Sequence, residues 1–352
     1  MLDCREGVRL VQVNSRHRVC VVMPTYNERD NLEPTLTDLF LRNAGVDVLI
    51  VDDNSPDGTG TLADVISRVT RLPQDLNVEH NENDVLRDVS FADEDSDSSL
   101  YSDTQVSTQD LKIADRLASC TMDSRVFVLH RPGKQGLGTA YIQGFEWALG
   151  HRYDIVCEMD MDGSHRPQDL RAIIDVLERH PQVDLVLGSR RVPGGSTQDW
   201  PWYRDVISRA GSQYARVMLG LKVRDMTSGF RAYRSRILRQ IDLDGIDANG
   251  YVFQIDMTRR VIAAGGHVVE VPIVFPDRTK GDSKMDGSIV REAMRKVTQW
   301  GFTRMQQTIL HNNERMERQV EDDLELPGQL MREDAGLAQD DPEQSEEYME
   351  RE

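Results

Sequence analysis

Two aspartates separated by a single residue, Asp160 and Asp162, stand directly after a short apolar segment at residues 154–159. Side chains two residues apart in an extended segment point to the same side, so both carboxylates can face one cation. Mg²⁺ and Mn²⁺ prefer oxygen ligands, and Mg²⁺ is commonly shared between one or two carboxylates and a substrate phosphate. The motif alone fits a solvated acidic turn at least as well, so the neighbouring segments have to decide between the two interpretations.

Two further polar clusters occupy the same kind of position. Pro24–Glu28 follows the apolar run at residues 18–23, and Asp52–Asp57 follows the run at residues 46–51. In an open α/β sheet, ligands bind outside the carboxyl ends of the strands. The three clusters are therefore predicted to meet in one crevice, which favours the metal site over the acidic turn.

The elements that would position these clusters alternate along the chain. This alternation predicts a doubly wound, mostly parallel sheet. Strands are expected at residues 18–23, 46–51, 125–130, 154–159, 183–187 and 267–274, and helices at about 31–42, 61–69, 138–148, from 167 onward, and 285–310.

The net charge of −18 is concentrated in two segments. Residues 73–124 hold 13 acidic against 3 basic side chains, and residues 311–352 hold 15 against 4. Both are polar and poor in clustered apolar residues, so both are expected to be disordered. The remaining chain is slightly basic and can approach an anionic ligand or membrane surface. The predicted organisation is an extension at 1–17, a catalytic domain at 18–310 interrupted by the 73–124 insertion, and a tail at 311–352.

Several protein classes are disfavoured by what the sequence lacks. No run of about 18 apolar residues is present, so no transmembrane helix is expected, and the N-terminus does not resemble a secretory leader. The four cysteines of the chain fit neither a zinc spacing nor a disulfide framework, which indicates a reduced, cytosolic chain. A dinucleotide oxidoreductase would need G-x-G-x-x-G after the first strand, where PTYNE stands instead. No nucleic-acid partner is expected.

The segments PTYNE (24–28), VDD (51–53), DMDG (160–163) and GSR (188–190) together resemble inverting glycosyltransferases of family 2, which have the GT-A, single Rossmann-like fold. Longer strings, including VVMPTYNERDNL, EMDMDGSH, WPWYRDVIS and VPIVFPDRTKGDSKM, resemble the polyprenyl (dolichyl) phosphate mannose synthases. The resemblance covers roughly residues 18–300, apart from the acidic insertion.

The resemblance implies a donor site for a nucleotide sugar. Asp160 and Asp162 would hold Mg²⁺ or Mn²⁺ across the diphosphate. Ser164, where some relatives place a Gln, is a doubtful third ligand. The remaining donor-binding residues implied are Pro24, Tyr26, Glu28, Val51, Asp53, Met161 and Arg190, with Arg278 and Lys284 on a loop that closes over the diphosphate.

The resemblance also implies an acceptor site around Arg190, Arg204 and Ser208, which with Asp162 form the expected catalytic set. Arg204 and Ser208 are four residues apart and share a face if the segment is helical. A guanidinium fork and a hydroxyl suit phosphate oxygens. Asp225 is a further possible sugar contact. The aromatic segment Trp200–Tyr203 suits a membrane interface or the core, and the 285–310 helix allows the same two interpretations.

The function implied is transfer of mannose from GDP-mannose to a polyprenyl phosphate, with inversion, by a peripheral enzyme on the cytoplasmic face of a membrane. A phosphate monoester arrives largely ionised, so it needs alignment more than a base, and His165 is expected only to pack or to contact the following helix. The alternatives are a UDP-glucose-dependent transfer to the same lipid, transfer to a soluble acceptor, and a non-catalytic nucleotide-binding scaffold.

Overall fold

The computed structural model describes residues 17–71, 106–120, 123–246, 251–277 and 287–336. The chain divides into two units, Met1–Val297 and Thr298–Glu352. The first unit carries the sheet and every described site residue.

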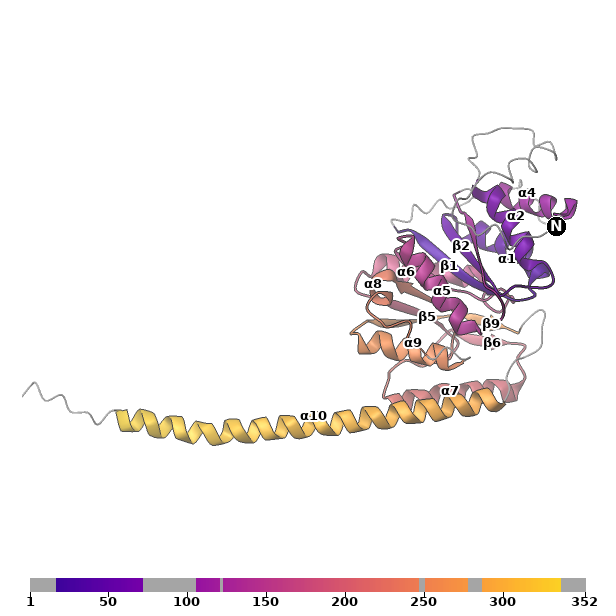
Figure 1. Ribbon diagram of the computed structural model, residues 1–352. Helices are drawn as coiled ribbons and strands as arrows, with labels where there is room; N and C mark the ends of the chain where they lie inside the picture. The colour runs from indigo at the N-terminus through magenta and orange to yellow at the C-terminus, as the bar shows by residue number, and fades with distance from the viewer. Residues whose placement is uncertain (1–16, 72–105, 121–122, 247–250, 278–286, 337–352) are drawn as a thin grey trace, which may run out of the picture. The chain divides into compact units, whose positions relative to one another are not determined.

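A seven-stranded sheet forms the centre of the first unit, in the order β3-β2-β1-β4-β7-β5-β8 (Figure 1). Its neighbouring strands are parallel except at β7, which runs antiparallel to both β4 and β5. The prediction of a mostly parallel sheet is thus confirmed. The strands are β1 (Val19–Thr25), β2 (Val46–Asp52), β3 (Val126–His130), β4 (Ile155–Glu158), β5 (Leu185–Ser189), β7 (Arg231–Arg234) and β8 (Val268–Pro272), and a separate parallel pair joins β6 (Ser196–Gln198) to β9 (Val274–Pro276).

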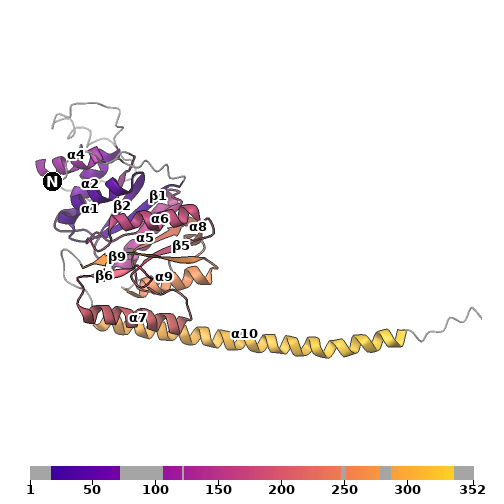
Figure 2. The same ribbon diagram turned by 180° about the vertical axis from the view of Figure 1, so that it is seen from behind.

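Helices cover both faces of this sheet (Figures 1 and 2). The face formed by Val19, Val21 and Met23 packs into the core cluster that includes α1, α2, α4 and α6. The opposite face carries α5 and α9. The helices are α1 (Arg29–Arg42), α2 (Thr59–Arg71), α4 (Thr108–Cys120), α5 (Leu137–Gly150), α6 (Pro167–Arg179), α7 (Trp202–Leu219), α8 (Ser235–Leu238), α9 (Tyr251–Ala263) and α10 (Gly287–Gly336).

Helix α5 approaches β1 so closely that a side chain would not fit at the contact. A Cβ atom built on Gly144 would lie 2.3 Å from Cγ1 of Val22. Val22 points to this face because successive strand residues alternate between the two faces. The absence of a side chain at Gly144 therefore sets the distance between α5 and the sheet.

The expectation of disorder across residues 73–124 is wrong for its last part. Residues 108–120 form α4, whose side chains Ile113, Ala114 and Leu117 are buried in the core cluster. Arg29 of α1 pairs with Asp110 of this helix. The spacing of the buried positions is helical, but the acidic composition of the surrounding segment hid it. Residues 72–105 lie outside the described part of the chain.

Residues 311–336, the first part of the segment expected to be a disordered tail, lie in a helix in the structure. Helix α10 begins at Gly287 in the first unit and continues through the second to Gly336. Its sequence is rich in Glu, Gln, Arg, Met and Leu, which are all good helix formers, and this propensity outweighs the excess of acidic charge. Among the described helices, none combines the length and apolarity needed to cross a membrane.

Candidate active site

The three polar clusters emerge side by side at one edge of the sheet, as predicted. They follow β1, β2 and β4, which are parallel neighbours in the order β2-β1-β4. Side-chain hydrogen bonds join the first two clusters: the Thr25 hydroxyl donates to Asp52 Oδ1 at 3.0 Å, and the Glu28 amide donates to Thr59 Oγ1 at 3.0 Å. The turns after β1 and β2 thus hold one another in place.

Asp53, expected to bind the nucleoside, is held by an arginine that sequence reasoning missed. Arg131 follows β3 and donates from Nη1 to Asp53 Oδ1 at 2.7 Å, and both side chains are buried. Burial raises the pKa of Asp53, and the charge of Arg131 offsets part of that rise. Arg131 also donates to Gln135, on the loop before α5, and to Thr139, in the first turn of α5. The sequence did offer a sign of this role, because Arg131 is a basic residue directly after a strand, whereas the other strand ends carry acidic residues.

The other expected nucleoside-binding residues differ in how they can act. Tyr26 is half-buried, and Lys134 Nζ lies 4.3 Å from the centre of its ring. Pro24 and Glu28 are half-buried at the same edge, with Glu28 accepting a hydrogen bond from Asn31. The side chain of Val51 is fully buried in the sheet, so only its backbone could contact a nucleotide.

Asp160 is oriented by a tyrosine and a histidine. The Tyr141 hydroxyl on α5 donates to Asp160 Oδ1 at 2.7 Å, and the Asp160 amide donates to His165 Nδ1 at 2.8 Å. Burial raises the pKa of Tyr141 well above its usual range, and the charge of Asp160 adds to that rise, so the hydroxyl remains a donor. The His165 ring stacks on Phe230 with 4.7 Å between centroids. The expected packing role of His165 therefore includes holding the backbone of a proposed metal ligand.

Asp162 is held by Ser164. Oδ1 of Asp162 accepts hydrogen bonds from the Ser164 amide at 3.0 Å and from its hydroxyl at 2.6 Å. This contact orients the carboxylate, while direct ligation by Ser164 stays a prediction. The Met161 side chain between the two aspartates is buried in the core, so only its backbone could contact the donor.

The donor set formed by Asp160 and Asp162 fits Mg²⁺ or Mn²⁺. Both supply carboxylate oxygens, which are hard ligands. Within the described residues, no group of three or more His, Cys, Asp or Glu side chains could enclose a metal ion. Two carboxylates match a cation that is shared with a diphosphate, because Mg²⁺ is commonly bound by one or two carboxylates together with waters and substrate phosphates.

A buried polar cluster surrounds Glu158, the last residue of β4, two positions before Asp160. Glu158 accepts hydrogen bonds from the Tyr233 hydroxyl at 2.7 Å and from Gln254 Nε2 at 2.6 Å. Burial raises the pKa of Glu158 to about 7, and the charge of Arg231 offsets part of the rise. The cluster ties β4 to β7 and α9 beneath the proposed metal ligands.

Arg190 follows β5 and is fixed by a buried carboxylate. Its amide, Nε and Nη2 donate to the carboxylate of Asp225 at 2.9, 2.8 and 2.7 Å. Burial alone would raise the pKa of Asp225, but the charge and hydrogen bonds of Arg190 hold it below its usual value. Asp225 is 0% exposed, so the suggestion that it contacts the sugar is not supported. It lies behind Arg190 and orients it.

Arg204 and Ser208 lie one turn apart on α7, as expected. The Arg204 guanidinium lies 4.0 Å from the centre of the Trp200 ring and donates to Asp277 Oδ1 at 2.7 Å. The Ser208 hydroxyl accepts a hydrogen bond from Nη2 of Arg191 at 2.9 Å. Arg191 is a second arginine that sequence reasoning did not single out. Arg278 and Lys284 lie outside the described residues.

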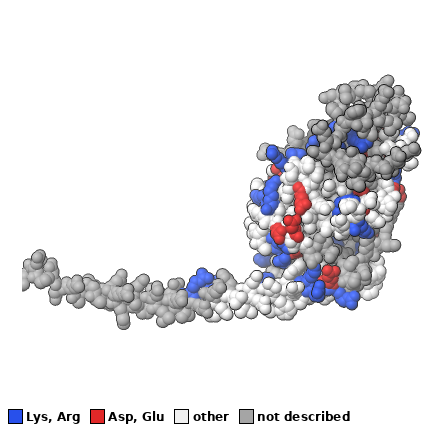
Figure 3. Space-filling model, viewed as in Figure 1, with Lys and Arg blue, Asp and Glu red and all other residues white. Residues whose placement is uncertain are grey.

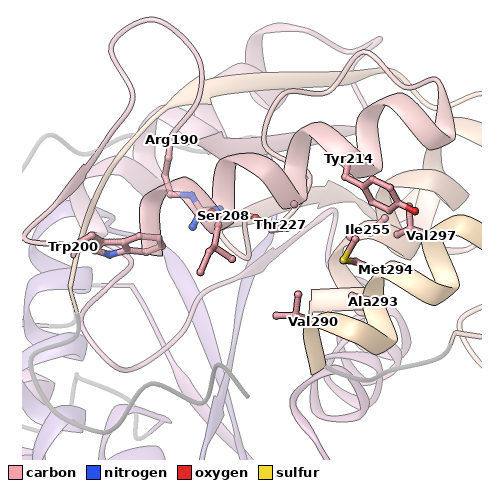
Figure 4. A pocket seen from close by; sticks show the side chains of 12 residues that line it. Arg190, Trp200, Ser208, Tyr214, Thr227, Ile255, Val290, Ala293, Met294 and Val297 are labelled. Atoms are coloured by element: carbon pink, nitrogen blue, oxygen red, sulfur yellow. Dashed lines mark hydrogen bonds between the residues drawn. The ribbon is translucent and has the colours of Figure 1, made fainter. Parts of the chain in front are cut away.

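A largely apolar pocket that includes Arg190 and Ser208, but not Arg204, lies between α7 and the first turns of α10 (Figure 4). Arg190, Ser208 and Thr227 supply polar groups to its lining, and Ile255, Val290, Met294 and Val297 supply apolar ones. Trp200 also lines it, whereas Trp202 and Tyr203 are 78% and 55% exposed. The aromatic segment Trp200–Tyr203 is thus divided between the pocket and the surface.

A mostly parallel sheet with paired aspartates after β4 and a buried carboxylate after β2 is the arrangement of a GT-A glycosyltransferase. The chain belongs to glycosyltransferase family 2, whose family model, described as "Glycosyl transferase family 2", matches residues 20–87 and 102–242.

Curated relatives cover most of the chain. It is 40% identical to polyprenol monophosphomannose synthase of Mycolicibacterium smegmatis, over 82% of this chain and 89% of the relative. It is 43% identical to undecaprenyl-phosphate mannosyltransferase of Micrococcus luteus, over 81% of this chain and 94% of the relative. Dolichol-phosphate mannosyltransferase of Pyrococcus furiosus is 29% identical over 80% of this chain and 62% of the relative. Among solved structures, glucosyl-3-phosphoglycerate synthase of Mycobacterium tuberculosis aligns at 15% identity with a TM-score of 0.49, over 81% of this chain and 80% of that chain.

Proposed function

We propose that this enzyme transfers a mannosyl residue from GDP-mannose to a polyprenyl phosphate with inversion, using Mg²⁺ or Mn²⁺. The two relatives at 40% and 43% identity are named for mannosyl transfer to polyprenyl carriers. The observation that carries the proposal is the pocket beneath α7, which combines a guanidinium and a hydroxyl with an apolar lining. A phosphate bound to a hydrocarbon chain needs this combination, because the headgroup requires charged donors and the chain requires apolar surface.

The pocket is connected to the aspartate pair by a series of ring contacts. His165, which accepts the Asp160 amide, lies edge-on to Phe275 with 5.4 Å between centroids. Phe275 in turn lies 5.2 Å from the Arg190 guanidinium and edge-on to Trp200. A donor diphosphate at Asp160 and Asp162 and a lipid phosphate at Arg190 would therefore meet across these rings.

Catalysis in this proposal depends on alignment and charge stabilisation. A phosphate monoester has a second pKa near about 6, so its oxygen attacks without a base. Arg190, Arg204 and Ser208 would orient that oxygen toward the anomeric carbon, while Asp160 and Asp162, held by Tyr141, His165 and Ser164, would hold the diphosphate through the cation. The bound cation would neutralise charge on the leaving diphosphate.

We also propose that the enzyme works as a peripheral protein on the cytoplasmic face of a membrane. Trp202, Tyr203 and Val206 on α7 are exposed by 78%, 55% and 53%, and Trp and Tyr are enriched at membrane interfaces. Figure 3 shows both basic and acidic side chains on the described surface of this face, so membrane binding is inferred from the exposed apolar side chains of α7.

The test is incubation of the protein with Mg²⁺, undecaprenyl phosphate and separate labelled GDP-mannose, UDP-glucose and UDP-galactose. Label from GDP-mannose alone is expected in the lipid phase, and an Asp162→Ala variant is the control. Transfer from UDP-glucose instead would establish the alternative donor. Transfer of no sugar to the lipid would overturn the proposal.

A further inference from the structure

Arg191 lies directly behind Ser208 and outside the pocket lining. Its Nη2 donates to Ser208 Oγ at 2.9 Å, and its Nη1 donates to Asp205 Oδ1 at 2.6 Å. The Arg191 side chain is only 6% exposed, and Ser208 lines the pocket whereas Arg191 does not. Ser208 therefore stands between Arg191 and any ligand in the pocket.

The direction of this hydrogen bond constrains the Ser208 hydroxyl. A serine hydroxyl carries one hydrogen and two acceptor lone pairs, whereas a guanidinium can only donate. In the contact with Arg191, the Ser208 oxygen must be the acceptor, so its own hydrogen points elsewhere. Among the described residues, the structure shows Arg191 as the hydrogen-bond partner of this hydroxyl.

Arg191 is itself held firmly enough to act as a support. Asp205 accepts hydrogen bonds from Arg191 and from Arg209, where the Nε–Oδ2 distance is 2.6 Å. Thr197 of β6 also donates to Asp205, at 3.3 Å. The guanidinium is thus anchored on a carboxylate that would keep other partners if Arg191 were replaced.

We propose that Arg191 is a positioning residue that fixes the Ser208 hydroxyl as a hydrogen-bond donor toward the phosphate of the acceptor. Arg191 does not touch the phosphate in this arrangement. Hydrogen bonds in chains polarise one another, so a serine that accepts from a cation becomes a better donor to an anion. The inference rests on the proposed function, because it names the phosphate of that acceptor.

A double-mutant cycle on the full-length protein tests this arrangement. The variants are Arg191→Met, Ser208→Ala and their combination, with steady-state kinetics for farnesyl phosphate as a short acceptor and for GDP-mannose. Arg209→Met is the matched control, because Arg209 binds the same Asp205 but is 59% exposed. We expect Arg191→Met to raise the KM for farnesyl phosphate about five- to tenfold, since one charge-assisted hydrogen bond is lost. The KM for GDP-mannose should stay unchanged.

The combination decides between positioning and an independent role. If Arg191 acts through Ser208, Arg191→Met should change the acceptor KM by less than about twofold in the Ser208→Ala background. Full multiplication of the two single effects would overturn the inference, as would an unchanged acceptor KM in Arg191→Met. If that variant does not fold, Arg191→Lys replaces it in the same cycle. The two failures are distinguishable. A wild-type protein that transfers no sugar to any polyprenyl phosphate would overturn the proposed function itself, whereas an active wild type with either of the kinetic results above would overturn only the role of Arg191.

Discussion

The ring nitrogen Nδ1 of His165 accepts a hydrogen bond from the backbone amide of Asp160 at 2.8 Å. A protonated Nδ1 could not accept, so this contact fixes the tautomer with the hydrogen on Nε2. The same ring stacks on Phe230. The histidine that follows the aspartate pair therefore acts on the backbone that carries the first aspartate.

Replacing His165 should loosen Asp160 and weaken use of the metal. We expect His165→Ala to lower kcat/KM about 10- to 100-fold and to raise the Mg²⁺ concentration needed for half-maximal rate, as loss of a supporting contact does at metal sites. His165→Asn places an acceptor near Nδ1 and should retain more activity. This role would be contradicted if both variants showed the same dependence of the rate on Mg²⁺ concentration as the wild type.

Removing either proposed ligand should be far more severe. Asp162→Ala is expected to lower kcat by at least about a thousandfold, because the charge on the leaving diphosphate would lose its stabilisation. Circular dichroism should show an unchanged fold, since the substitution removes a carboxylate at the edge of the sheet. Wild-type turnover by this variant with Mg²⁺ present would refute the metal assignment.

Arg131→Met should destabilise the protein. It would leave the buried Asp53 carboxylate without its ion-pair partner, and breaking a buried pair costs about 3–5 kcal/mol. Urea denaturation measures the loss. The double variant Arg131→Met/Asp53→Asn removes the unpaired charge and should recover part of the stability. No recovery would show that Arg131 acts mainly through its other contacts.

Asp225→Asn should remove a contribution to stability that depends on pH. The folded-state pKa of Asp225 is held below its unfolded value, so ionised Asp225 stabilises the protein above about pH 4. That contribution is lost as pH falls through the folded-state pKa. The difference in unfolding free energy between wild type and variant should be largest near pH 7 and should shrink below about pH 4. A difference that is constant between pH 3 and pH 7 would contradict it.

Arg204→Ala should affect the acceptor more than the donor. The guanidinium stacks on Trp200 and lies beside Ser208 on α7, so we expect the KM for polyprenyl phosphate to rise about tenfold or more. Arg204→Lys keeps the charge but loses the planar fork, and it should fall between wild type and Arg204→Ala. Unchanged acceptor kinetics in both would remove Arg204 from the site.

The strands that carry the site could be predicted from the sequence because each is an apolar run that stops at a polar turn. β7 could not be predicted in this way. Arg231, at its start, is fully buried and is satisfied by the Gln254 carbonyl and the Thr258 hydroxyl, two partners on a helix that follows later in the chain. A local sequence pattern does not predict a buried arginine, because its hydrogen-bond partners come from a distant part of the chain.

The same reason separates the site residues that were predicted from those that were missed. Asp160 and Asp162 stand together in a short motif, so their spacing was visible. Arg131 and Arg191 act on Asp53 and Ser208, which lie 78 and 17 residues away in the sequence. Their roles emerge only when folding brings these segments together.

The close approach of Gly144 to Val22 gives a residue with no reactive side chain an influence on the proposed metal site. Tyr141 lies one turn before Gly144 on α5, and its hydroxyl meets Asp160. A methyl group at Gly144 would push the helix outward and carry that hydroxyl away from the carboxylate. A change in the packing between α5 and β1 would then alter the affinity of the proposed metal site, although this contact lies away from the reacting groups.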